Sequence, residues 1–197
     1  IYSDYTIFVA EVASTLNEAL LMHYLLKNTC DQQKKLYLLN EYIDQLRGTL
    51  YIQTIFAEFE KEIHTRYESG EALTAEFLNQ TTRELYTRYY GPDFEMNPLY
   101  DINWCRIPHF YYNFYVYQYA TGISAATTLA QKILNGDKKA RDAYIYFLSR
   151  GSADYSIHLL KDAGVDMTSP EPIEATLHLF RKLVNEMKDL CNWNGSK

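Results

Sequence analysis

Apolar residues recur every three or four positions along most of the chain. Between Tyr5 and Lys27 the polar interruptions are few, and the apolar stripe consists of Val9, Val12, Ala13, Leu16, Leu20, Met22, Leu25 and Leu26. This spacing predicts a long helix that is mostly buried. Asp31 can cap a second helix, which carries apolar residues through to Ile63 and has its weak point at Gly48.

The same rule predicts further helices, joined by short connections. Thr74 is an N-cap candidate, and the Asn-Gly-Asp turn at 135–137 ends one helix and caps the next. Residues 93–108 contain two prolines and no clear period, so we expect an ordered loop there. The tail 192–197 is expected to fray. The predicted helices cover about residues 75–89, 110–134, 138–149, 155–163 and 173–191.

Residues 110–119 are the ambiguous part of this pattern. They are β-prone in composition and alternate well enough to fit a strand. We favour a helix, because no turn separates them from residues 120–134, whose pattern is plainly helical. Since no convincing strand pair occurs, the sequence predicts an all-α protein in which residues 1–197 form a single helical domain.

Two carboxylates interrupt the apolar stripe of the first predicted helix. Glu11 and Glu18 are seven residues apart and therefore share nearly one face, with Ser14 between them. Burial of two carboxylates requires partners such as a metal, an arginine or a histidine. The alternative is a solvated polar stripe on an amphipathic helix. Because the surrounding helix is apolar nearly all round, both interpretations stay open.

A run of tyrosines follows a single histidine further along the chain. Nineteen of the 197 residues are tyrosine, and five of them fall between Tyr111 and Tyr119. At about 100° per residue, a helix would place Tyr112 and Tyr119 on the same side as His109. Histidine and tyrosine are donors suited to a developing oxyanion, although a core histidine among aromatic residues would give the same pattern.

No other segment carries a recognisable catalytic motif. There is no glycine-rich phosphate loop, no Gly-x-Ser-x-Gly turn and no cysteine with a nearby base. The other histidines lie on separate predicted helices without an His-x-x-x-His pair, which favours surface or half-buried positions: these are His23, His64, His158 and His178.

Charge and cysteine content exclude several classes of protein. The net charge is −6 and no segment clusters Lys and Arg, so a nucleic-acid partner is not expected. No apolar segment approaches the ~20 residues that span a bilayer, so no membrane partner is expected either. Cys30, Cys105 and Cys191 are widely spaced and odd in number, as expected of free thiols in the cytoplasm.

The carboxylate-bearing and tyrosine-rich segments together resemble oligoendopeptidase F, a relative of thimet oligopeptidase among the zinc-dependent oligopeptidases. The resemblance runs from residues 1–20, which include Glu11-Val-Ala-Ser-Thr, through residues 106–122, which include Arg106-Ile-Pro-His109, to the terminal helices. It implies an all-helical endopeptidase acting on short peptides, with long antiparallel helices lining a substrate channel. It also implies one zinc ion, bound by two histidines of a His-Glu-x-x-His helix and by a glutamate.

The resemblance assigns roles to both glutamates. Glu11 opens the motif that carries the family's glutamate ligand, so it should be the third zinc ligand. Glu18 matches a second family glutamate, expected in the outer shell, where it would steady a ligand.

The resemblance also assigns roles within the tyrosine-rich run. His109 and Tyr112 match the histidine and tyrosine that contact the scissile carbonyl, and Tyr119 matches a further tyrosine near the substrate. Tyr115 is expected to bind substrate. The spacing from the histidine is shorter than in thimet-type members, so the assignment among the three tyrosines stays open by one helical turn.

No His-Glu-x-x-His occurs anywhere in residues 1–197. We therefore expect this chain to be the C-terminal part of the enzyme, with the N-terminal part of the same protein as its partner, and to be inactive alone. The chain starts at Ile1, within a segment expected to be ordered, which agrees with a fragment. Two alternatives are a non-catalytic helical module that binds peptides or a partner, and a regulatory fragment that folds only with its other half.

Overall fold

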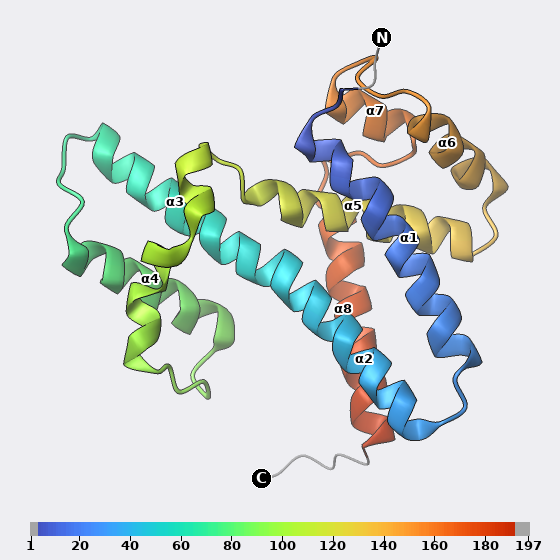
Figure 1. Cartoon of the computed structure of the whole chain (residues 1–197), viewed down its shortest axis with the longest axis horizontal. Helices are drawn as coiled ribbons and strands as arrows, with labels where there is room; N and C mark the ends of the chain where they lie inside the picture. The colour runs from blue at the N-terminus through green and yellow to red at the C-terminus, as the bar shows by residue number, and fades with distance from the viewer. Residues whose placement is uncertain (1–3, 192–197) are drawn as a thin grey trace. The chain divides into compact units, whose positions relative to one another are not determined.

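The computed structural model describes residues 4–191, and every regular element in that range is a helix (Figure 1). The predicted all-α class is therefore confirmed. Contacts divide the chain into two compact units: the first comprises Ile1–Leu50 and Thr121–Lys197, the second Tyr51–Ala120. Within the described range no helix has the length and apolarity needed to cross a bilayer. The predicted fraying of 192–197 concerns residues outside this range.

The first unit is built on α1 (Ile7–Asn28), which packs against α5 (Tyr117–Leu134) from Thr121 onward (Figure 1). Val12 and Leu16 of α1 are fully buried in the same hydrophobic cluster as Ala125 and Ala126 of α5. Small residues let the two helices approach closely, and this packing forms the core of the unit. Around it lie α2 (Gln32–Leu46), α6 (Lys138–Leu148), α7 (Ser156–Asp162) and α8 (Glu171–Leu190).

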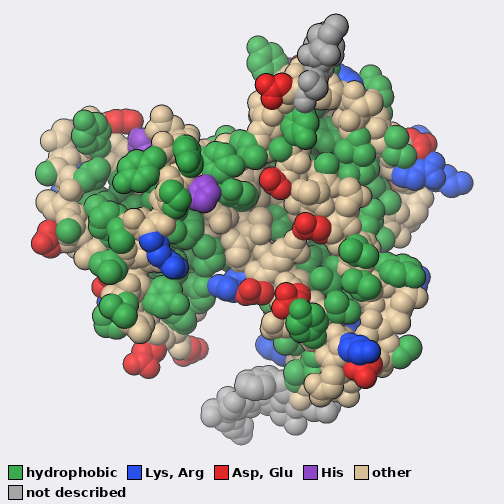
Figure 2. Space-filling model, viewed as in Figure 1, with side chains coloured by type: hydrophobic (Ala, Val, Ile, Leu, Met, Phe, Trp, Pro, Cys, Tyr) green, Lys and Arg blue, Asp and Glu red, His purple; other side chains and the backbone are tan. Residues whose placement is uncertain are grey.

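The second unit contains α3 (Ile52–Glu68), α4 (Ala75–Tyr90) and two 3₁₀ helices, η2 (Pro98–Arg106) and η3 (Pro108–Tyr112). Its core consists of Ile55 and Phe59 from α3 with Leu85 and Tyr86 from α4, and Phe110 packs against this core. Hydrophobic side chains, a class that includes tyrosine, cover much of the visible face of this unit in Figure 2.

Caps predicted from the sequence are present in the structure. The Asp31 side chain accepts a hydrogen bond from Lys34 N, and Thr74 Oγ1 accepts one from Phe77 N. Asp137 caps α6 by accepting from the backbone N–H groups of Lys139 and Ala140. Each cap satisfies donors that a helix leaves free in its first turn, which is why these boundaries could be predicted.

Gly48 marks the weak point of the second predicted helix. The α-helical geometry of α2 ends at Leu46, a π-helical turn, η1, covers Arg47–Tyr51, and α3 follows. A π turn inserts one extra residue into the helical ladder. The prediction of one helical run interrupted at Gly48 is confirmed.

The predicted helix 110–134 is wrong in its first part. Asn113 (φ 42°) and Phe114 (φ 54°) both have left-handed backbone conformations, and α5 begins only at Tyr117. Aromatic and β-branched residues favour helices weakly, so tertiary contacts decide the local structure here. The ring of Phe110 packs against those of Phe56 and Phe59 on α3, which fixes the chain before the break.

Two further expectations need correction. The loop predicted for 93–108 contains a 3₁₀ helix, whose start is capped by Asn97 accepting from Leu99 N. The first helix is not mostly buried, since only four residues of α1 are buried in the described chain, Val9, Val12, Leu16 and Ala19. Leu21 is 57% exposed and Tyr24 is 63% exposed, so one apolar side of α1 lies open.

Candidate functional site

Glu11 is half-buried on α1, opposite a close approach of α5. A Cβ added at Gly122 would lie 3.6 Å from the Glu11 Cβ, an ordinary van der Waals contact, so the α5 backbone lies directly beside this side chain. Ser14 Oγ donates to Glu11 Oε2 at 3.0 Å. Within the described residues Oε1 accepts no hydrogen bond. A carboxylate held through one oxygen, with the other available, fits the donor type that zinc takes from glutamate.

Glu18 lies on the same helix but is exposed. Its Oε2 accepts a hydrogen bond from Gln45 Nε2 of α2 at 2.7 Å. This contact links α1 to α2 and fixes the orientation of the carboxylate. The predicted outer-shell role of Glu18 stays a prediction.

His109 lies at the centre of three tyrosines in the second unit. Its ring centroid is 5.6 Å from that of Tyr115 in a stacked geometry, and 6.2 Å and 6.1 Å from those of Tyr112 and Tyr119, both edge-on. Tyr115 in turn contacts both other tyrosines. We call His109, Tyr112, Tyr115 and Tyr119 the His109 cluster.

The exposure of the His109 cluster suits contact with a ligand. Tyr112 is 64% exposed, whereas His109, Tyr115 and Tyr119 are half-buried. The half-buried rings of Tyr115 and Tyr119 pack around the imidazole, and most of the Tyr112 side chain lies in solvent. The sequence placed these residues together through a single helix, but the structure brings them together across the break at 113–114.

Sequence reasoning missed Glu60, whose carboxylate touches that break. Glu60 lies on α3, is 1% exposed, and accepts a hydrogen bond from Phe114 N at 2.7 Å through Oε1. Burial raises the pKa of Glu60, while the Phe114 N–H and the charge of His64 act in the opposite direction. The available signal was an acidic residue within the apolar stripe of the second predicted helix.

The site residues predicted from the sequence fall into two groups, one in each unit. Glu11 and Glu18 belong to the first unit, and the His109 cluster belongs to the second. Across residues 4–191 no three or more His, Cys, Asp or Glu side chains come together as a metal site. Glu11 is thus one potential ligand rather than part of a complete set.

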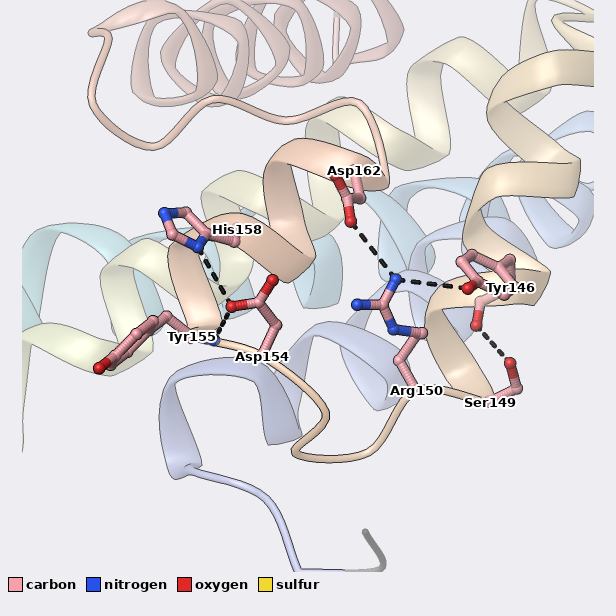
Figure 3. Close-up of polar contacts among 7 residues, drawn as sticks. All are labelled: Tyr146, Ser149, Arg150, Asp154, Tyr155, His158 and Asp162. Atoms are coloured by element: carbon pink, nitrogen blue, oxygen red, sulfur yellow. Dashed lines mark hydrogen bonds and ion pairs between the residues drawn. The ribbon is translucent and has the colours of Figure 1, made fainter.

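A polar cluster orders the connection between α6 and α7 in the first unit (Figure 3). Asp154 accepts from Tyr155 N at 2.7 Å and pairs with His158 Nδ1 at 3.2 Å. The Tyr155 N–H, followed by the His158 hydrogen bond, lowers the pKa of Asp154. Because Ser156 Oγ hydrogen-bonds Thr6 Oγ1 at 2.6 Å, this connection also holds the start of α1, one turn before Glu11.

A cavity of about 500 Å³ lies elsewhere in the first unit, between α1, α2, α5 and α8. It is lined by Lys27, Lys182 and His178, and by the ion pair of Lys35 with Glu186 at 2.8 Å. Neither Glu11 nor Glu18 lines it. The cavity is therefore separate from the two predicted carboxylates.

Comparison with known families decides what the chain is related to. The model of peptidase family M3 matches residues 1–179. The chain belongs to peptidase family M3. The relatives and solved structures described next include an oligoendopeptidase F, so the predicted resemblance to that enzyme is confirmed.

Among curated M3 relatives, Oligopeptidase PepF of Bacillus subtilis is 53% identical over 96% of this chain and 28% of its own length. Group B oligopeptidase PepB of Streptococcus agalactiae is 45% identical over 96% of this chain and 32% of its own length. The chain thus spans about a third of the length of these relatives.

Solved structures show the same fold. The crystal structure of oligoendopeptidase-F from Enterococcus faecium matches with a TM-score of 0.91 and 46% identity, over 95% of this chain and 36% of that one. The crystal structure of a putative peptidase from Chlamydophila abortus matches with a TM-score of 0.90 and 43% identity, over 96% and 32% respectively. The helical arrangement described above is therefore that of an M3 peptidase segment.

Proposed function

We propose that the protein containing this chain is a zinc-dependent endopeptidase that hydrolyses short peptides in the cytoplasm. The observation that carries the proposal is the His109 cluster, in which one imidazole is surrounded by three phenols in a chain of peptidase family M3. The relatives named above are oligopeptidases. Three exposed and unpaired cysteines agree with a reducing compartment.

Glu11 would contribute one carboxylate oxygen to the metal. Ser14 holds Oε2 by a hydrogen bond, which would orient the carboxylate before the metal binds. A bound zinc ion supplies Lewis acidity and lowers the pKa of its water. The two histidine ligands and the glutamate that would accept the proton of water are expected on a His-Glu-x-x-His helix in the N-terminal part of the same protein.

His109 and Tyr112 would donate hydrogen bonds to the oxygen of the scissile carbonyl as it gains negative charge. Fixed donors stabilise such an oxyanion more effectively than water, because they need no reorganisation during the reaction. The stacked ring of Tyr115 and the edge-on ring of Tyr119 would limit the orientations open to the imidazole of His109. Tyr115 and Tyr119 would also line the path of the peptide.

Substitution of His109 tests this function. In the full-length protein, His109→Ala should lower turnover of a short peptide on the order of 10²-fold, because a donor to the oxyanion is lost. The zinc content should stay unchanged. Tyr111→Phe is a matched control, since Tyr111 is 87% exposed and lies outside the His109 cluster. Near-normal turnover of His109→Ala would contradict the assigned role.

A further inference from the structure

One face of α3 carries the contacts that shape the turn between Tyr112 and Tyr115. Phe56 and Phe59 contact the ring of Phe110, with centroid distances of 5.8 and 5.1 Å. Glu60 directly follows Phe59 on α3, and its Oε1 accepts a hydrogen bond from Phe114 N at 2.7 Å. The α3 helix therefore contacts the chain on both sides of Tyr112.

Glu60 contacts Phe114 where the backbone of the second unit has an unfavourable conformation. Asn113 and Phe114 both have positive φ, a region that residues with a side chain rarely adopt. The ring of His64, one turn after Glu60 on α3, lies 4.5 Å from the ring of Phe114. Two neighbouring residues of α3 thus hold the backbone and the side chain of the same residue.

We propose that Glu60 is a positioning residue for the His109 cluster. Its buried carboxylate fixes the turn at Asn113–Phe114, and this turn folds Tyr115 and Tyr119 back against His109. The inference rests on the proposed role of His109, because it assigns Glu60 an effect through that residue and no contact with substrate or metal.

Burial of a carboxylate inside an apolar helix face needs a reason beyond packing. Removal of a charged or polar group from water is unfavourable unless hydrogen bonds replace the lost water. Burial raises the pKa of Glu60, as expected for this location. A carboxyl oxygen of Glu60 can accept the Phe114 N–H whether or not the side chain carries a proton. The hydrogen bond therefore needs an acceptor rather than a charge.

Paired substitutions separate the acceptor from the charge. Glu60→Gln keeps a side-chain oxygen in the same place and should leave kcat within about threefold of the wild type. Glu60→Leu removes the acceptor and should lower kcat on the order of 10- to 100-fold, because His109 and Tyr112 would be displaced from the oxyanion. The zinc content should stay unchanged. Glu62→Leu, on the exposed side of α3, is the control and should leave kcat within about twofold. Equal kcat for Glu60→Leu and Glu62→Leu would overturn the proposal.

A double-mutant cycle distinguishes positioning from a general loss of stability. If Glu60 acts through His109, Glu60→Leu should cost much less kcat in the His109→Ala background than in the wild type. Equal losses in both backgrounds would overturn the positioning role. Normal turnover of His109→Ala alone would instead remove the proposed function on which the inference rests.

Amide hydrogen exchange provides a test that needs no variant. Phe114 N should exchange at least about 10²-fold more slowly than an unstructured amide, because Glu60 is its acceptor. If Glu60→Leu fails to fold, this measurement tests the proposal in the wild type. A protected Phe114 amide supports the hydrogen bond to Glu60, and an unprotected one overturns the proposal.

Discussion

At the scale of single residues, the two glutamates of α1 differ in their surroundings. Glu11 is half-buried beside Gly122 and accepts one hydrogen bond from Ser14, whereas Glu18 is exposed and bonded to Gln45. A ligand and a residue that only steadies one should respond differently to the same change. One pair of variants, at Glu11 and at Glu18, can therefore test whether the first is a zinc ligand and the second only steadies a ligand.

We predict that Glu11→Gln in the full-length protein loses zinc, because an amide oxygen is a much weaker zinc ligand than a carboxylate. Glu18→Gln should retain stoichiometric zinc and lose activity by about 10- to 100-fold at most. Metal analysis after gel filtration, combined with peptide hydrolysis, gives both readouts. Stoichiometric zinc in Glu11→Gln would refute its assignment as a ligand.

At the scale of elements, the sequence predicted helices well where local chemistry sets their ends. Asp31, Thr74 and Asp137 are short polar side chains just before an apolar period, and each caps a helix in the structure. The break at Asn113–Phe114 could not be predicted in this way. Its hydrogen-bond acceptor, Glu60, lies 54 residues away on another helix, and no local signal reports such a partner.

Asp137 allows a prediction at this scale. Asp137→Ala removes the acceptor for the backbone N–H groups of Lys139 and Ala140 and should lower the free energy of unfolding by about 1 kcal/mol. Asp142→Ala is a control on the same helix, because its ion pair with Arg141 is exposed and should contribute about 0–0.5 kcal/mol. Urea denaturation followed by circular dichroism measures both. Equal values for the two variants would contradict the capping role.

At the scale of the whole molecule, the fold class could be predicted from the helical spacing of apolar residues, and the family from the two motif segments, which are specific. The roles of Glu11 and the His109 cluster rest on that resemblance, since each group alone had an ordinary structural explanation. That these helices line a substrate channel, and that residues 1–197 act as one domain, stay predictions.

The last prediction concerns the chain separated from the rest of its protein. Produced alone, residues 1–197 should show no zinc-dependent hydrolysis of a short peptide, because they offer Glu11 as a ligand but contain no His-Glu-x-x-His. Addition of the separately produced N-terminal part should restore measurable turnover, with the intact protein as the reference. Restoration should fail when the added part carries a Glu→Gln change within its His-Glu-x-x-His, since the proton acceptor would be lost. Zinc-dependent hydrolysis by the isolated chain would show instead that its own residues complete the site.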